Sequence, residues 1–227
     1  MRYAILADIH ANLSALKTVL ADAEKQECTQ YACLGDIVGY NFHPKECLEI
    51  IREMKMPTVK GNHDEYAASE TEPHGFTEQA AKNVNWTREQ LDEEARQWLR
   101  ELNYVKQLDG FTIVHATLDG PQRWGYVFDK LAAAASFTYQ NTAVCFFGHT
   151  HVPVAFTQDS VVRGGTYSKF TVERGRKYFI NVGSVGQSRD GIRKATYVIY
   201  DLNQRSIELR RLDFSPDDEI AAPLAVG

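Results

Sequence analysis

The chain has 227 residues, of which 44% are hydrophobic and 24% are charged, and its formal net charge is −5. This length and hydrophobic content allow one substantial core, so we expect a single domain over residues 1–227. The acidic balance disfavours stable nucleic-acid binding, which needs a basic face, and no apolar run approaches the length of a transmembrane helix. Because Met1 and Arg2 lead directly into a predicted strand, we expect no cleaved signal peptide and a cytoplasmic protein.

In the N-terminal part of the chain, short apolar runs alternate with amphipathic segments. The runs predict strands at residues 3–7, 31–34, 58–59, 111–114 and 144–147. Helical spacing predicts a helix over residues 13–23, capped by Asn12, and a second from Pro44 to Met54. Strands separated by helices favour parallel pairing, which brings their carboxyl ends to one edge of a sheet. Ligands bind at that edge in open α/β sheets.

The remaining segments indicate a helical cover and a second sheet. Residues 65–75 form an acidic, turn-prone link, residues 76–107 have the pattern of a covering helical pair, and residues 130–139 predict another helix. Further strands are expected at residues 152–156, 177–182, 196–202 and 206–214, forming a mostly antiparallel sheet. The tail after residue 214 is expected to be loosely held.

The four cysteines are interpreted as structural thiols. Cys28, Cys33, Cys47 and Cys145 lack the paired spacing of a zinc knuckle. Three of them lie in apolar or amphipathic runs, where a reduced cysteine packs as a small hydrophobic residue.

Polar strings rich in histidine follow the predicted strands. They contain eight imidazole, carboxylate and amide groups: Asp8, His10, Asp36, Asn62, His63, His115, His149 and His151. Imidazole and carboxylate suit borderline divalent ions, and the lack of thiolate ligands argues against a closed structural zinc site. This layout predicts a two-metal hydrolytic centre. His43 and His74, outside these strings, are interpreted as ordinary surface or capping residues.

The ordered strings Asp-x-His, Gly-Asp, Gly-Asn-His-Asp, a lone His and Gly-His-x-His resemble those of the calcineurin-like metallophosphoesterases. The likeness extends over about residues 3–214. The strings at residues 35–40, 181–186 and 189–191 are similar to the small prokaryotic branch described as predicted phosphodiesterases. The resemblance implies an α/β fold, a four-layer α/β/β/α sandwich with two mixed β-sheets.

The resemblance also implies a division of the ligands. Carried over by position, the first ion would be held by Asp8, His10 and His151, the second by Asn62, His115 and His149, and Asp36 would bridge them. Two divalent transition-metal ions are implied, with Mn²⁺ the first choice and Fe, Zn, Co or Ni as alternatives. Such ions share a water that becomes hydroxide near neutral pH, and His63 would protonate or stabilise the leaving oxygen.

One departure from a neighbouring branch concerns the partner of His63. The serine/threonine phosphatases follow Gly-Asp with Tyr-Val-Asp-Arg-Gly, where the second Asp supports the catalytic His and the Arg grips phosphate. Gly39-Tyr40-Asn41 stands in that stretch here, so His63 needs another partner, for which Asp64 is the candidate.

Two arginines are candidates for substrate binding. Arg123, close to Trp124 and Tyr126, could belong to a substrate-facing loop, and Arg189 could reach substrate phosphate. The alternative is that both lie in ordinary exposed loops.

The expected function is hydrolysis of phosphate esters, with diesters preferred. Phosphomonoesters and dinucleoside polyphosphates remain alternative substrates, and a non-catalytic metal-binding scaffold is the alternative from another class. The expected partner is a phosphate ester, which could be derived from a nucleotide. No membrane association is expected, and a homo-oligomer is left open.

Overall fold

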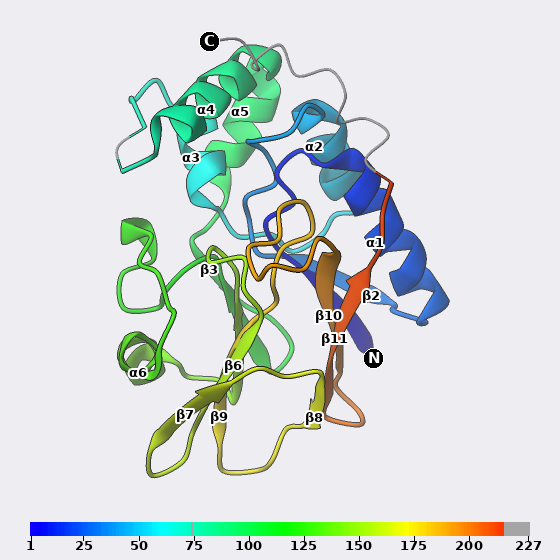
Figure 1. The fold of residues 1–227 in the computed structure, drawn as a ribbon, viewed down its shortest axis with the longest axis vertical. Coiled ribbons are helices and arrows are strands. Elements are labelled where there is room, and N and C mark those ends of the chain that lie inside the picture. The colour runs from blue at the N-terminus through cyan, green and yellow to red at the C-terminus, as the bar shows by residue number, and fades with distance from the viewer. Residues whose placement is uncertain (74, 216–227) are drawn as a thin grey trace.

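The computed structural model describes residues 1–73 and 75–215, which build two mixed sheets between layers of helices (Figure 1). One sheet has five strands in the order β2 (Gln30–Cys33), β1 (Arg2–Leu6), β10 (Ala195–Asp201), β11 (Ser206–Leu212) and β8 (Lys169–Thr171). The other has six, in the order β3 (Val105–Gln107), β4 (Phe111–Val114), β5 (Val144–Phe147), β9 (Lys177–Asn181), β6 (Val154–Gln158) and β7 (Val162–Gly165).

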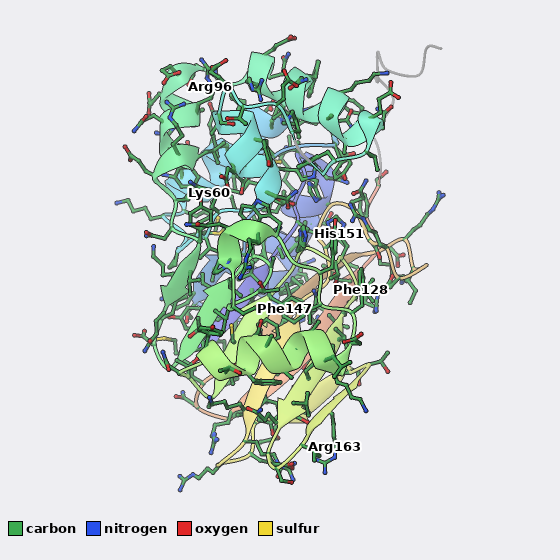
Figure 2. All side chains as sticks on the ribbon, turned by 90° about the vertical axis from the view of Figure 1, so that its left-hand side faces the viewer. Lys60, Arg96, Phe128, Phe147, His151 and Arg163 are labelled. Carbon is green, nitrogen blue, oxygen red and sulfur yellow. The ribbon has the colours of Figure 1, made fainter. Side chains whose placement is uncertain are left out.

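The helices cover the outer faces and one end of the sheets. The helices α1 (Leu13–Lys25) and α2 (Pro44–Glu53) lie on the side of the five-stranded sheet, and α6 (Lys130–Tyr139) crosses the six-stranded sheet (Figures 1 and 2). At the end of the molecule, α3 (Asn62–Ala68), α4 (Glu78–Gln90) and α5 (Glu93–Glu101) pack together. A short 3₁₀ turn, Pro121–Arg123, precedes α6.

Apolar side chains fill the three spaces between the four layers. Ile5 and Phe146, one from each sheet, are fully buried in the space between the sheets. Leu16 of α1 belongs to the core on the far side of the five-stranded sheet, and Phe137 of α6 to the core outside the six-stranded sheet. The predicted α/β/β/α sandwich is therefore confirmed.

Local sequence signals explain the first two helices. The Asn12 side chain accepts a hydrogen bond from the backbone N–H of Ala15 at 3.0 Å, which caps α1 as expected. Leu13, Leu16 and Val19 lie on one face of this helix and are buried. Pro44 occupies the first turn of α2, where its missing N–H costs nothing.

Parallel pairing brings several strand ends to one edge. The strands β1 and β2 are parallel in the first sheet, and β4, β5 and β9 are parallel in the second. Backbone hydrogen bonds continue beyond the strands: Asp8 N–H donates to Gly35, and Gly148 N–H donates to His115. The loops with the polar strings therefore start side by side.

The expected division into an early parallel sheet and a late antiparallel sheet is wrong. The late strand β10 inserts beside β1, and β9 lies beside β5, so both sheets mix early and late strands. The periodicity of apolar residues indicates which face of a strand is buried, but it does not indicate which strand lies next to it in the sheet. Residues 58–59 form only isolated bridges, to Cys33 and Asn103. The strands β3, β7 and β8 and the helix α3 were not predicted, because they are short or only partly buried.

Several other expectations have simple outcomes. All four cysteines are buried and free of disulfides. Among the described residues, no helix is both long enough and apolar enough to cross a membrane. His43 precedes α2, pairs with Glu46 at 3.5 Å and belongs to neither group of clustered metal-binding side chains. His74 and the tail from residue 216 onward lie outside the described residues.

Candidate metal centre

The backbone turns sharply just after the strands, and this directs the polar side chains toward one another. Five of the predicted metal ligands have positive φ angles, between 50° and 65°: Asp8, His10, Asp36, His149 and His151. This left-handed conformation is uncommon for residues other than glycine and clusters at functional sites. Gly35, before Asp36, also has a positive φ, and a Cβ on it would lie 2.4 Å from the backbone nitrogen of Gly61. The two loops can approach this closely because residue 35 is a glycine.

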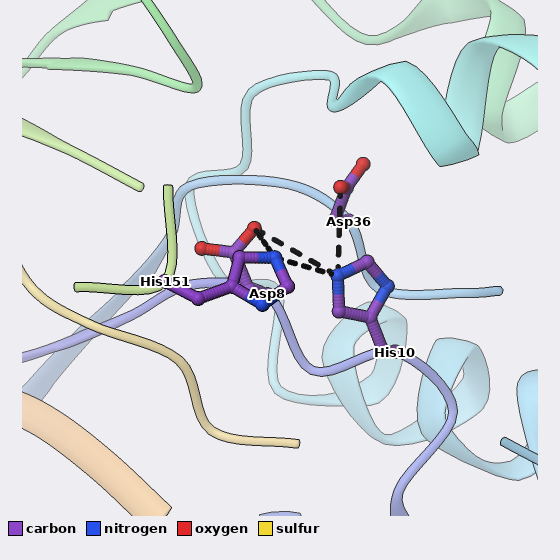
Figure 3. A group of neighbouring side chains, drawn as sticks. All are labelled: Asp8, His10, Asp36 and His151. Atoms are coloured by element: carbon purple, nitrogen blue, oxygen red, sulfur yellow. Dashed lines mark hydrogen bonds and ion pairs between the residues drawn. The ribbon is translucent and has the colours of Figure 1, made fainter. Parts of the chain in front are cut away.

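The predicted ligands lie in two buried groups that have one residue in common. Asp8, His10, Asp36 and His151 form the first group, shown in Figure 3, and Asp36, His115 and His149 form the second. The Oδ2 atom of Asp36 lies 3.6 Å from Nε2 of His10 and 3.4 Å from Nε2 of His115. One carboxylate oxygen therefore faces a histidine of each group.

Each of the four clustered histidines has one ring nitrogen fixed by a backbone carbonyl. The contacts are His10 Nδ1 to Val38 at 3.2 Å, His115 Nδ1 to Leu34 at 2.7 Å, His151 Nδ1 to Gln187 at 2.5 Å, and His149 Nε2 to Trp124 at 3.0 Å. A carbonyl oxygen only accepts, so the ring nitrogen that faces it carries the hydrogen. In the neutral ring the opposite nitrogen then has a free lone pair, which is the state that binds a metal ion.

The free nitrogens are placed so that they need a cation between them. The Nε2 atoms of His10 and His151 lie 3.1 Å apart, although both rings donate through Nδ1. Two lone pairs repel at this distance unless a metal ion or a proton lies between them. The donor set therefore fits a bound divalent ion.

The carboxylates also set the charge of the cluster. Burial opposes protonation of His115, but Asp36 and Asp8 outweigh it and raise the pKa of His115 to about 9 in the metal-free protein. Burial lowers the pKa of His149 to about 3 and also lowers the pKa of His10. The carboxylates of this centre thus attract positive charge strongly, which a metal ion can supply in place of a proton.

Asn62 lies beside the second group. It is the first residue of α3, and its Oδ1 is 3.2 Å from Nε2 of His115. In the metal-free protein a protonated Nε2 donates to this oxygen, and once His115 is neutral, with Nδ1 donating to Leu34, the two atoms face each other as acceptors. The position suits an amide oxygen that shares an ion with His115.

Asp64 does not support His63, so that expectation is wrong. Its carboxylate accepts backbone N–H groups from Asp36 at 2.8 Å, Ile37 at 2.9 Å and Gly61 at 3.1 Å. The turn after β2 leaves these N–H groups without strand partners, and the buried carboxylate satisfies them. Asp64 therefore holds the loop that bears Asp36.

His63 is held by aromatic rings. Its ring centroid lies 4.6 Å from that of Tyr40, and 4.8 Å from those of Phe76 and His10. Within the described residues, the buried Nδ1 of His63 has no hydrogen-bond partner. A Cβ on Gly39 would lie 2.4 Å from this Nδ1, so no side chain fits there. Burial lowers the pKa of His63 to about 4, although Asp36 opposes this.

A pocket of about 330 Å³ opens over the two groups and is lined by both predicted arginines. Arg189 donates to the Tyr40 hydroxyl at 3.3 Å and to Oε1 of Gln187 at 3.1 Å. Arg123 donates to the backbone oxygen of Asp119 at 3.0 Å, in its own loop. Arg189 is therefore tied to a residue that packs on His63, whereas Arg123 binds back to its own turn.

Two aromatic residues around this pocket had no predicted role, and a third, Tyr126, was expected only as part of a candidate substrate-facing loop. Tyr40 and Phe76 were not assigned a contact with His63, and the ring of Tyr126 stacks on His149 with centroids 4.3 Å apart. Only the position of Tyr40, directly after the glycine that replaces the phosphatase carboxylate, could have indicated its role. Phe76 and Tyr126 are brought in by long loops.

The chain matches known proteins along most of its length. A family model for the calcineurin-like phosphoesterase superfamily domain matches residues 1–205. An uncharacterized protein of Methanocaldococcus jannaschii is 34% identical over 217 residues, which cover 93% of this chain and 87% of the relative.

Solved structures agree with this family. A metallophosphoesterase from Sphaerobacter thermophilus has a TM-score of 0.84 at 33% identity, covering 96% of this chain and 91% of the other. A hypothetical protein of Pyrococcus horikoshii has the same fold, with a TM-score of 0.75 at 19% identity and coverages of 96% and 92%. The chain therefore belongs to the calcineurin-like phosphoesterase superfamily, a metal-dependent family of hydrolases that act on phosphoric esters.

Proposed function

We propose that this protein is a phosphodiesterase with a dinuclear metal centre. Asp8, His10 and His151 would hold one ion, and Asn62, His115 and His149 the other, with Asp36 shared. The observation that carries the proposal is the position of Asp36 Oδ2, which faces His10 in one group and His115 in the other. Two divalent ions held in this way supply positive charge for the phosphate oxygens and lower the pKa of a water that attacks phosphorus.

The protein's own residues would orient the substrate around this centre. The backbone N–H of His63 donates to Asp36 Oδ1 at 2.8 Å, which fixes this carboxylate and leaves Oδ2 for the ions. The ring of His63 lines the pocket, where a ring N–H can donate to the leaving oxygen.

The charge around the pocket favours a diester over a monoester. The lining includes two arginines, Arg189 and Arg123, and Arg123 is turned toward the backbone oxygen of Asp119 in its own loop. A diester carries one negative charge, which the centre and Arg189 can neutralise. A dianionic monoester would require further cations to gain the same stabilisation.

The nature of the ions and the location of the protein are further parts of this proposal. Imidazole, carboxylate and amide ligands suit divalent transition ions, for which we take Mn²⁺ as the first choice and Fe, Zn, Co or Ni as alternatives. The four free and buried cysteines support a reducing compartment and thus a cytoplasmic location.

The direct test compares two p-nitrophenyl esters on metal-reconstituted protein. We expect kcat/KM for bis(p-nitrophenyl) phosphate to exceed that for p-nitrophenyl phosphate, and a chelator to abolish both activities. A tenfold or greater preference for the monoester would instead make the protein a phosphomonoesterase. If the protein with its ions bound hydrolyses neither ester, the non-catalytic metal-binding scaffold is favoured. Including dinucleoside polyphosphates in the assay tests the remaining alternative.

A further inference from the structure

Two parallel aromatic rings are exposed beside the metal pocket. The rings of Tyr126 and Phe128 have centroids 5.5 Å apart and an interplanar angle of 4°. Tyr126 is 53% exposed and Phe128 is 65% exposed. Large aromatic rings are mostly buried, so an exposed parallel pair at the edge of a pocket indicates a surface for a ligand.

The pair separates the metal pocket from a second hollow. Tyr126 lines the metal pocket and stacks on His149, whereas Phe128 lines a hollow of about 480 Å³. Thr150, between His149 and His151, also lines this hollow, which therefore begins next to the metal centre. In the view of Figure 2, Phe128 lies below His151.

The lining of the hollow suits a flat heterocycle. Its lining is mainly apolar and includes Phe128, Pro153, Val154 and Phe156, and its polar groups come from Asp129, Lys130, Thr150 and Thr166. Aromatic and aliphatic walls accept the faces of a base, and isolated polar groups can bond to its edge. The volume lies within the range of about 300 to 1,000 Å³ that is usual for small-molecule sites.

We propose that this hollow binds the base of a nucleoside ester whose phosphate lies on the metal centre. The inference rests on the proposed diesterase function, because a diester has a second ester group that must lie outside the metal pocket. The base would stack on the ring of Phe128, which lines this hollow, and Tyr126 would support that ring from the side of the metal pocket. The preferred substrates are therefore diesters in which one ester group is a nucleoside.

Phe128 is the suitable residue for a test. Replacing Tyr126 would also remove a contact with His149, whereas Phe128 is largely exposed and makes its ring contact with Tyr126. Phe128→Leu keeps an apolar side chain but removes the aromatic face, and Phe128→Trp restores such a face. Tyr139→Leu is the control, because Tyr139 is a 60% exposed aromatic residue of α6 that lines neither hollow.

The assay uses two diesters that share the leaving group p-nitrophenol, one with thymidine and one with ethanol as the other ester group. For the wild type we expect a KM about tenfold lower for the thymidine ester, since stacking of one base is worth roughly five- to a hundredfold. Phe128→Leu should remove this difference without changing kcat/KM of the ethyl ester. Phe128→Trp and Tyr139→Leu should retain it.

The outcomes separate the inference from the proposed function. If the ethyl ester is hydrolysed but the wild type shows no preference for thymidine, the inference is wrong and the diesterase function stands. The inference also fails if Phe128→Leu leaves the preference unchanged, or if it lowers activity on both esters equally. If the wild type hydrolyses neither ester with its ions bound, the diesterase function itself is refuted.

Discussion

At the scale of the residue, His63 lies beside the proposed ligands without sharing their hydrogen-bonding pattern. Among the residues that the structure describes, its Nδ1 has no hydrogen-bond partner, whereas each of the four clustered histidines has a ring nitrogen fixed by a backbone carbonyl. We predict that His63→Ala retains the bound ions and loses activity. Donation of a proton to the leaving group typically raises the rate by about 10²- to 10⁴-fold. The loss of rate in His63→Ala should therefore be largest for poor leaving groups such as ribose alcohols.

The leaving-group series distinguishes the possible roles of His63. With p-nitrophenolate, which is a stable anion at neutral pH, the loss of rate in His63→Ala should be smaller. An equal penalty for every leaving group would assign His63 to stabilising charge on the phosphoryl oxygens instead. Loss of the ions in His63→Ala would contradict both roles, because His63 would then be a ligand or a support for the fold.

The aromatic contacts of His63 lead to a second prediction at this scale. Phe76 packs edge-on against His63, and an aromatic pair of this kind contributes about 0.5 to 1.5 kcal/mol. Phe76→Leu should therefore lower kcat by roughly two- to tenfold while KM and metal content stay unchanged. Phe42→Leu is the matched control, since Phe42 contacts Trp86 and lies outside the pocket. Equal kcat in Phe76→Leu and the wild type would show that packing does not position His63.

At the scale of the element, one carboxylate ties α1 to the five-stranded sheet. Asp22 accepts hydrogen bonds from Tyr197 of β10 at 2.7 Å and from Nε and Nη2 of Arg210 of β11, both at 3.1 Å. Burial opposes ionisation of Asp22, but these donors outweigh it and hold its pKa below the ordinary value. The bonds link three elements through one partly buried group.

Asp22→Asn should lower the free energy of unfolding by about 1 to 2 kcal/mol at neutral pH. Because the pKa of Asp22 is lower in the folded protein, its contribution is fully present above the unfolded value of about 3.9 and is lost as the pH falls through the folded value. Urea unfolding at pH 7 and at decreasing acid pH should therefore show the difference between the two proteins shrinking. Two results would contradict this role of Asp22. One is an unchanged free energy of unfolding for Asp22→Asn at pH 7, and the other is a decrease no larger than that of the exposed control Glu24→Gln.

The elements also show how far the sequence could predict the fold. The strands before Asp8, Asp36, His115 and His149 were predictable, because runs of buried residues end in polar strings. Their distribution over two sheets was not, since β10 pairs with β1 across nearly 200 residues. The helix α3 was missed because its seven residues begin inside the Gly-Asn-His-Asp string, and Asn, His and Asp have low helix propensity.

At the scale of the whole molecule, the site depends on two sheets that end at the same place. Asp8 follows β1 of one sheet and His149 follows β5 of the other, and the His149 N–H donates to Oδ2 of Asp8 at 3.0 Å. The motifs predicted which residues gather here. They could not predict the backbone carbonyls that orient the imidazoles, because a carbonyl such as that of Trp124 carries no signal in its side chain.

The account depends most on the sharing of Asp36 between the two groups of ligands, and metal analysis of purified variants tests this directly. We predict two ions per chain in the wild type, loss of both in Asp36→Asn, and loss of one in His151→Ala. The control Asp213→Asn should keep both, since Asp213 is exposed and pairs with Lys194. A single ion in the wild type, or full occupancy and normal activity in Asp36→Asn, would contradict the dinuclear centre.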